Sequence, residues 1–201
     1  LVMKQILISQ RIFKDKHKQL QFSLEKEWIE YFKNKNVQLI PIFSKSENIN
    51  IYIKKFKPKC VIISGGSNNI FSNSNENILR RKIDKKIFDL CQKKKIPILA
   101  VCYGFQYIAK LSKGEIIKTK QKPGKDHYIY LNDKIINVNS FHNFAVTKLP
   151  KHFKTIGTHQ DNSIEIAYSK KLNILCTMFH PERKNKSQNT INNIIFKYLK
   201  L

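Results

Sequence analysis

The sequence predicts an α/β fold in which helices cover both faces of a mostly parallel sheet. Short apolar runs alternate with amphipathic stretches in the first half of the chain, and their connections are long enough for the crossovers that parallel strands need. In addition, Gly65-Gly66 and Cys102 directly follow apolar runs, as turns at the carboxyl ends of buried strands do. Ligands of such folds bind beyond these strand ends, so we expect the functional site there.

The first half of the chain supplies this alternation. Apolar residues within 20–35, such as Leu24, Trp28 and Phe32, recur at helical spacing and predict one apolar helix face. The Asn- and Ser-rich 67–77 and the Lys- and Asn-rich 44–50 are predicted loops. In order, the expected elements are strand 4–9, helix 20–35, strand 37–43, strand 60–64, helix 78–95, strand 96–101 and helix 105–111.

From about residue 115 the pattern changes to short strands with little helix. A helix over 190–199 is expected to follow the solvated loop 183–189. The expected strands are 115–118, 127–131, 135–138, 164–168 and 174–178. Because no internal repeat or linker interrupts the 201 residues, we expect a single domain.

Composition is typical of a cytoplasmic globular protein. Hydrophobic residues make up 41% of the chain, and neither a membrane span nor a signal peptide is predicted. The four cysteines form no CxxC motif, which favours reduced thiols over a disulfide framework. The histidines show no ligand spacing, so no metal site is predicted.

The formal charge of +24 raises the question of a nucleic-acid partner. Arginine occurs only at Arg11, Arg80, Arg81 and Arg183, whereas lysines are spread along every segment. Nucleic-acid sites concentrate basic residues and favour arginine, so this scattered charge argues against such a partner. We expect the positive field to attract anionic small molecules.

Three strand ends supply the groups of a cysteine-nucleophile hydrolase. Cys102 lies on the turn between an apolar strand and a helix, where the helix N-terminus favours a thiolate. The segment 179–182, Phe-His-Pro-Glu, offers an imidazole and a carboxylate. We expect Cys102 to attack a carbonyl, His180 to move the proton and Glu182 to orient the imidazole.

Two backbone N–H groups are predicted to form the oxyanion hole, those of Gly66 and Tyr103. Glycine at position 66 lets the backbone approach the substrate with no side chain between them. Taken singly, a cysteine in a turn and a Gly-Gly after a strand are more often structural. Their occurrence together, each after a strand, favours the catalytic interpretation.

These motifs resemble the class I glutamine amidotransferase superfamily over nearly the whole chain. The segments that carry the resemblance are Ser64-Gly65-Gly66, Cys102 with Gly104 and Gln106, and Phe179-His180-Pro181-Glu182-Arg183. Further segments resemble its γ-glutamyl hydrolase branch, namely Arg80 with Asp84, Asn139-Ser140-Phe141-His142 and Asp161-Asn162-Ser163-Ile164-Glu165. The resemblance implies a flavodoxin-like three-layer sandwich, one catalytic domain over 1–201, and hydrolysis of a γ-glutamyl amide by a Cys-His-Glu triad without a cofactor.

The resemblance also suggests substrate-binding residues. Gln106 and the segment of Ser140, Phe141 and His142 are candidates for the glutamyl pocket, although His142 fits a structural loop histidine equally well. Arg11 is a candidate for a phosphate of a nucleotide-linked leaving group, because its planar fork suits phosphate oxygens. An ordinary surface salt bridge is the simpler interpretation of Arg11.

Departures from the family pattern bear on the substrate more than on the chemistry. Ala100 stands where the elbow usually has Gly, Tyr103 where this branch often has Arg, and Arg81 where the pattern has Asp. Three rival interpretations remain: a glutaminase subunit that feeds ammonia to a separate synthetase, a non-catalytic relative, and a nucleic-acid binder. The intact triad residues argue against the second.

Overall fold

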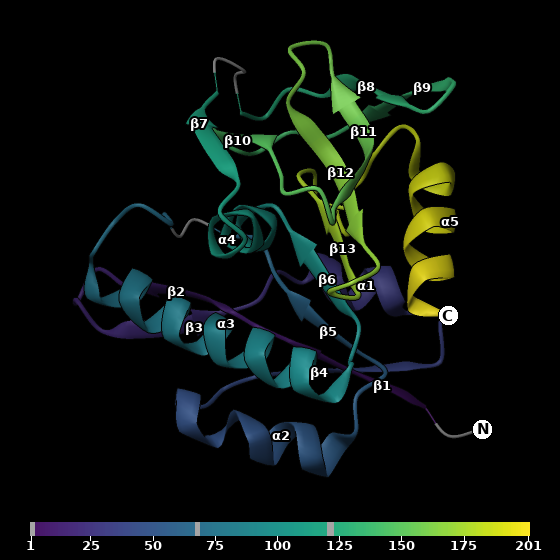
Figure 1. The fold of residues 1–201 in the computed structure, drawn as a ribbon. Helices are drawn as coiled ribbons and strands as arrows, with labels where there is room; N and C mark the ends of the chain where they lie inside the picture. The colour runs from purple at the N-terminus through teal and green to yellow at the C-terminus, as the bar shows by residue number, and fades with distance from the viewer. Residues whose placement is uncertain (1–2, 67–68, 120–122) are drawn as a thin grey trace.

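A large mixed sheet forms the centre of the computed structural model, which describes residues 3–66, 69–119 and 123–201 (Figure 1). The sheet has 11 strands in these residues. They are β1 (Lys4–Ile8), β4 (Val37–Pro41), β5 (Cys60–Ile63), β6 (Ile98–Val101), β7 (Glu115–Lys118), β8 (His127–Leu131), β9 (Lys134–Val138), β10 (Phe144–Lys148), β11 (Lys154–His159), β12 (Ile164–Ser169) and β13 (Ile174–Thr177).

The sheet has a parallel and an antiparallel part. The parallel order is β4-β1-β5-β6-β13, and antiparallel pairing continues through β12, β11, β8 and β9. β10 pairs with β12 and β7 beside this path. β5, β6 and β13 are therefore adjacent and parallel, and the loops that follow them meet at one edge.

Helices cover both faces of the sheet, as the α/β prediction requires. They are α1 (Glu27–Phe32), α2 (Ile49–Phe56), α3 (Asn75–Lys94), α4 (Tyr103–Leu111) and α5 (Gln188–Leu199). One core cluster joins the sheet to α2, α3 and α4, with Ile53, Ile87 and Ile108 among its members. A second cluster joins the other face to α1 and α5 through Trp28 and Ile195. This layered α/β architecture confirms the predicted fold class.

The predicted helix over 20–35 is wrong over residues 20–26 and 33–35, because the helix spans only Glu27–Phe32. β2 (Arg11–Lys14) and β3 (Leu20–Ser23) pair as a separate two-stranded sheet, and helix begins only at Glu27. The turn between these strands is closed by Asp15, whose carboxylate accepts hydrogen bonds from the backbone of His17 and Gln19. Pairing with β2 holds residues 20–23 in an extended conformation, so they form no helix despite the helical spacing of their apolar residues.

Other differences are omissions or shifted boundaries. The predicted loop 44–50 includes a short 3₁₀ helix, Ser46–Asn48, and the start of α2. Strands β10 and β11 were not expected, and α3, α4 and α5 begin two or three residues earlier than predicted. Residues 67 and 68 of the predicted loop 67–77 lie outside the described residues. The remaining predicted strands are confirmed to within about two residues.

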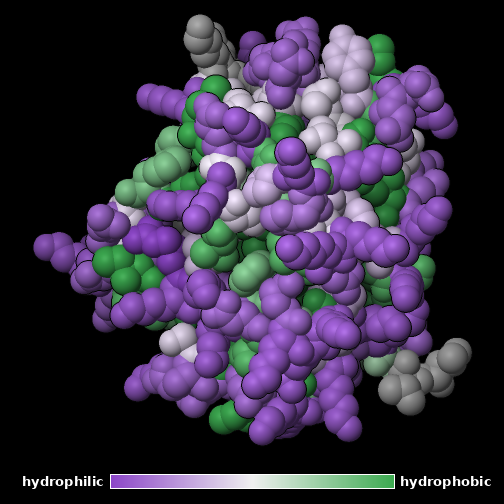
Figure 2. Space-filling model, viewed as in Figure 1, coloured by the Kyte–Doolittle hydropathy of each residue, from purple (hydrophilic) through white to green (hydrophobic). Residues whose placement is uncertain are grey.

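The hydropathy of the surface and the state of the cysteine thiols agree with what the composition predicts. Figure 2 shows hydrophilic side chains over most of one face, with hydrophobic ones in small separate patches. All four cysteines are buried and free of disulfides. No helix in the described part of the chain is long and apolar enough to cross a membrane.

Candidate active site

Cys102 lies on a strained turn between β6 and α4. Its backbone has φ of 50° and ψ of −104°, a conformation that L-residues rarely adopt. The turn is tight because α4 approaches β5, and a Cβ added at Gly104 would collide with the Ile63 carbonyl oxygen. Strand and helix thus hold the thiol at the N-terminus of α4, at the positive end of the helix dipole.

The other three cysteines lie in apolar surroundings. Burial raises the pKa of the Cys60, Cys91 and Cys176 thiols well above their ordinary value. These thiols therefore stay protonated near neutral pH and are poor nucleophiles. Cys102 differs from them in position, since it lines a cavity beside the imidazole of His180.

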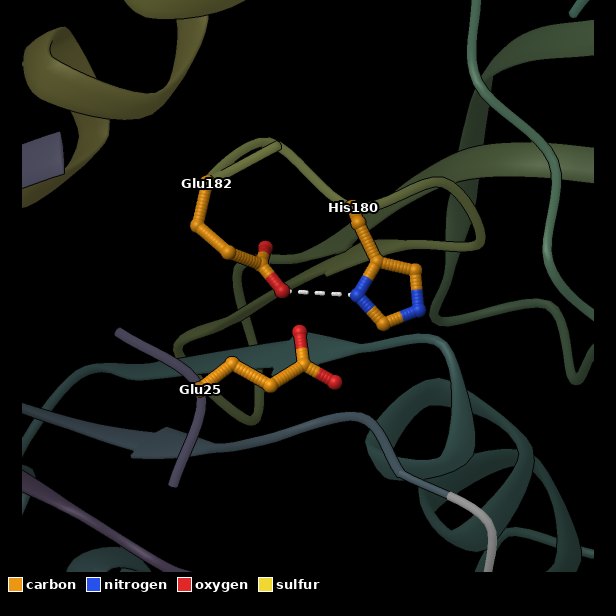
Figure 3. A group of neighbouring side chains, drawn as sticks. All are labelled: Glu25, His180 and Glu182. Carbon is orange, nitrogen blue, oxygen red and sulfur yellow. Dashed lines mark hydrogen bonds and ion pairs between the residues drawn. The ribbon is translucent and has the colours of Figure 1, made fainter. Parts of the chain in front are cut away.

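His180 follows β13 and meets the carboxylate of Glu182 (Figure 3). Its Nδ1 lies 2.6 Å from Oε1 of Glu182, and both side chains are almost fully buried. Burial by itself lowers the pKa of the imidazole, but Glu182 and the neighbouring Cys102 outweigh this effect and raise the pKa to about 10. The site therefore holds His180 as an imidazolium beside Cys102 at neutral pH.

Asn139 fixes the backbone of His180. Its Oδ1 accepts a hydrogen bond of 2.9 Å from the His180 N–H, and its Nδ2 donates one of 2.8 Å to the His180 carbonyl oxygen. Asn139 directly follows β9, so this pair of bonds ties the loop after β13 to the antiparallel part of the sheet. The asparagine belongs to the segment in which the glutamyl pocket was predicted; its role toward His180 was not predicted.

The two glycines after β5 allow a close approach of backbone to side chains. A Cβ at Gly65 would collide with Cε1 of the His180 ring. Gly66 has φ of 137°, and a Cβ there would lie 2.7 Å from Cβ of Arg11. The loop therefore passes between the imidazole and Arg11 only because both positions lack a side chain.

A cavity of about 430 Å³ opens at this edge of the sheet. Most predicted site residues line it, namely Arg11, Gly66, Cys102, Tyr103, Gln106, Phe141, His142 and His180. Ser140 does not: it is buried, and its hydroxyl has no hydrogen-bond partner among the described residues. Glu182 also lies behind the cavity, where it contacts the far side of the imidazole.

One wall of the cavity is built by the segment between β9 and β10. Gln106 Nε2 donates to the Phe144 carbonyl oxygen at 3.2 Å, and His142 Nδ1 lies 3.0 Å from the same oxygen. On its other side, His142 Nε2 lies 3.7 Å from the buried carboxylate of Glu165. Burial lowers the pKa of His142, which favours the neutral ring. His142 thus lines the cavity and also braces the loop, and its contact with a glutamyl group stays a prediction.

An ion pair at the cavity rim was not predicted from the sequence. Arg183 donates from Nε and from a terminal nitrogen to the two oxygens of Glu25, at 3.0 and 2.6 Å. The guanidinium also lies 4.2 Å from the centroid of the Phe141 ring. Burial raises the pKa of Glu25, but Arg183 outweighs it and the pKa is lowered. The position of Arg183 directly after His-Pro-Glu was a usable signal, whereas nothing local marks Glu25.

Glu25, His180 and Glu182 are also the described residues that most resemble a metal site. One ligand atom from each lies within 4.8 Å of the others. Figure 3 shows the three side chains beside one another. Both oxygens of Glu25 already accept hydrogen bonds from Arg183, and Oε1 of Glu182 faces His180. Contacts among the protein's own charged side chains therefore explain why Glu25, His180 and Glu182 lie close together.

Comparison with protein families identifies the class to which this chain belongs. The glutamine amidotransferase class-I family model matches residues 13–198, and the chain belongs to that family. It is 33% identical to the γ-glutamyl-CDP-amidate hydrolase of Campylobacter jejuni over 189 residues, which are 90% of this chain and 92% of the relative.

The chain is also similar to a GMP synthase and to two solved structures. The GMP synthase of Brachyspira hyodysenteriae is 30% identical over 141 residues, 65% of this chain but only 26% of the synthase. Among solved structures, a protein from Thermoplasma acidophilum described as a GMP synthase subunit superposes with a TM-score of 0.72 at 18% identity, covering 98% of this chain and 94% of its own. A glutamine amidotransferase from Thermotoga maritima gives a TM-score of 0.66 at 16% identity, covering 96% and 82%. These superpositions confirm the fold.

Proposed function

We propose that this chain is a single-domain hydrolase that cleaves γ-glutamyl-CDP-amidate to glutamate and cytidine diphosphoramidate, a precursor for capsule modification. The observation that carries the proposal is that Cys102 and His180 line one cavity, while Glu182 contacts the imidazole of His180 from behind it. The substrate is taken from the similarity to the Campylobacter jejuni hydrolase, which extends over nearly all of both chains. The four free, buried cysteines favour a reducing compartment, so we place the reaction in the cytoplasm.

In the first half-reaction, the Cys102 thiolate attacks the γ-carbonyl carbon and forms a tetrahedral intermediate. The backbone N–H groups of Gly66 and Tyr103 stabilise its oxyanion, an effect worth about 3 kcal/mol per donor in comparable sites. The C–N bond then breaks, and the His180 imidazolium gives its proton to the departing nitrogen. The products of this step are a γ-glutamyl thioester on Cys102 and the free phosphoramidate.

In the second half-reaction, water hydrolyses the thioester. Neutral His180 takes a proton from the water as it attacks, while Glu182 stabilises the imidazolium that forms. Collapse of the second tetrahedral intermediate releases glutamate and restores the Cys102 thiolate. The proton that His180 gives up in one half-reaction is thus recovered in the other.

Arg11 is our candidate for recognition of the leaving group. It lines the same cavity as Cys102, and its buried Nε has no hydrogen-bond partner among the described residues. A buried guanidinium N–H without an acceptor is costly, and a phosphate oxygen would supply one. We assign contact with the glutamyl group to Gln106 and to the cavity wall that Phe141 and His142 form.

Glutamate release by the purified chain tests this proposal. We expect release from γ-glutamyl-CDP-amidate, loss of that activity in Cys102→Ala, and little change in the control Cys91→Ala, which removes a thiol from the core. We also expect Arg11→Lys to raise KM for the nucleotide substrate by about tenfold and to leave KM for simple γ-glutamyl amides unchanged. A folded protein that releases no glutamate from any of these compounds would contradict the proposal.

A glutaminase subunit is the second candidate, favoured by the matches to the amidotransferase part of GMP synthases. It predicts ammonia release from free glutamine that increases when a separate synthetase is added. Activity on glutamine without activity on γ-glutamyl-CDP-amidate would decide for this candidate.

A further inference from the structure

Arg80 of α3 is a fully buried arginine that contacts both sides of the proposed oxyanion hole. Its Nε donates to Asp84 at 2.8 Å, and a terminal nitrogen donates to the Ser64 carbonyl oxygen at 2.8 Å and to the Ser64 hydroxyl at 3.2 Å. Its other terminal nitrogen lies 3.5 Å from the Gly65 carbonyl oxygen. The guanidinium carbon lies 4.5 Å from the centroid of the Tyr103 ring.

Stability alone is a poor explanation for this arrangement. Buried ion pairs such as Arg80–Asp84 lose hydration of both charges, and apolar residues of similar volume often serve stability as well or better. What an apolar residue cannot do is donate several hydrogen bonds at fixed angles to a loop. We propose that Arg80 is a positioning residue, which sets the two backbone N–H groups of the oxyanion hole. This inference rests on the function proposed above.

The Gly66 N–H is set through the preceding peptide group. In a trans peptide the C=O and the next N–H point in opposite directions in one plane. Because Arg80 contacts the Gly65 carbonyl oxygen from inside the protein, the Gly66 N–H is directed away from Arg80. Gly66 lines the catalytic cavity and Arg80 does not, so the opposite side is the side of the substrate.

The Tyr103 N–H is set through its side chain. Tyr103 is the first residue of α4, and the N–H groups of a first helical turn have no partner within the helix. Its ring is almost fully buried and packs against the Arg80 guanidinium. The planar guanidinium of Arg80 thus contacts both the loop after β5 and the first turn of α4. It therefore keeps the N–H groups of Gly66 and Tyr103 at a constant separation.

The test compares Arg80→Lys with the matched control Arg81→Lys. Lysine keeps the charge but has no planar fork, and Arg81 contacts loop carbonyls at Ile70 and Ser72, away from the oxyanion hole. For hydrolysis of γ-glutamyl-CDP-amidate we expect Arg80→Lys to lower kcat by about tenfold to a hundredfold, with KM within about twofold. The Arg81→Lys control should keep kcat within about twofold.

The rate at which iodoacetamide alkylates Cys102 distinguishes a damaged oxyanion hole from a general structural defect. A general defect would change this rate as well as the rate of hydrolysis. Alkylation needs the thiolate but no oxyanion hole, so its rate in Arg80→Lys should equal that of the wild-type protein. Equal losses of alkylation and hydrolysis would overturn the inference, and so would an unchanged kcat. If Arg80→Lys fails to fold, Tyr103→Leu replaces it, because leucine keeps the backbone N–H and removes the ring.

Amide hydrogen exchange separates this inference from the proposed function. We expect the amide of Ser64, which lies in the loop that Arg80 contacts and donates to the Ser9 hydroxyl, to exchange at least about tenfold faster in Arg80→Lys than in Arg81→Lys. A wild-type protein that hydrolyses no γ-glutamyl compound would refute the proposed function, and this exchange difference would still decide whether Arg80 holds the loop. Equal exchange in both variants would refute the positioning role.

Discussion

His180 and Glu182 are two residues apart in sequence, yet their side chains form a short contact of 2.6 Å in the interior of the protein. Pro181 and the turn that follows β13 bring the carboxylate back onto Nδ1 of the imidazole and leave the other ring nitrogen for the cavity side. Exposure of the Glu182 side chain is only 1%, so water does not screen its charge. A short local motif therefore places a strong, oriented field on the imidazole.

Glu182→Gln should lower kcat by at least about a hundredfold, because the neutral amide no longer stabilises the imidazolium. The pKa of His180 should fall toward its ordinary value of 6.5, since Glu182 is a main cause of its rise. Titration of the His180 ring by NMR and a pH profile of kcat measure both effects. Glu30→Gln, at an exposed position, is the control. An unchanged His180 pKa in Glu182→Gln would contradict this account of the site.

The raised pKa of His180 also predicts how stability depends on pH. Folding raises this pKa from 6.5 to about 10, so the folded state binds the proton more tightly. The stabilisation is fully present below about pH 6.5 and is lost as the pH rises through about 10. The difference in unfolding free energy between the wild-type protein and His180→Gln should therefore shrink over this range. Urea unfolding at several pH values measures it, and a constant difference would contradict the prediction.

Asn139 offers a test of the backbone support of His180. Asn139→Ala removes the buried acceptor of the His180 N–H and one donor to the His180 carbonyl oxygen, to which Asn185 Nδ2 still donates at 3.1 Å. The substitution should lower the unfolding free energy by about 2 kcal/mol. It should also lower kcat, because the imidazole loses its fixed position. Asn137→Ala is a suitable control for stability, since the Asn137 Oδ1 has no hydrogen-bond partner among the described residues. Similar losses in both variants would argue against a specific role for Asn139.

The parts of the site that lie within short motifs were predictable from sequence. The turn at Cys102, the two glycines after β5 and the segment 179–182 each follow a strand, and adjacent parallel strands bring such ends together. The same reasoning predicted the layered α/β fold. Prediction from sequence succeeded for these parts because each motif depends on local backbone requirements that its residue types indicate.

The predictions that were wrong or missing concern features that depend on long-range contacts. The segment 20–23 has helical spacing but pairs with Arg11–Lys14, and no local property of 20–23 distinguishes the two outcomes. Glu25 and Arg183 are far apart in sequence and meet only when the hairpin β2–β3 and the loop after β13 are both in place. Arg80 looked like part of a family pattern, whereas its contacts with Ser64 and Tyr103 appear only in the folded structure.

The two glycines Gly66 and Gly157 allow a matched test of the loop after β5. Gly66→Ala places a Cβ at a φ of 137° and 2.7 Å from Cβ of Arg11, so we expect a loss of about 1–3 kcal/mol in unfolding free energy. The loop must shift to relieve this contact, and kcat should fall by at least about tenfold because the Gly66 N–H moves with it. A Cβ at Gly157 meets its neighbours at 3.5 Å, an ordinary contact, so Gly157→Ala should leave kcat within about twofold. Urea unfolding and steady-state kinetics on both variants distinguish the effects, and a Gly66→Ala protein with full activity would show that this backbone N–H takes no part in the reaction.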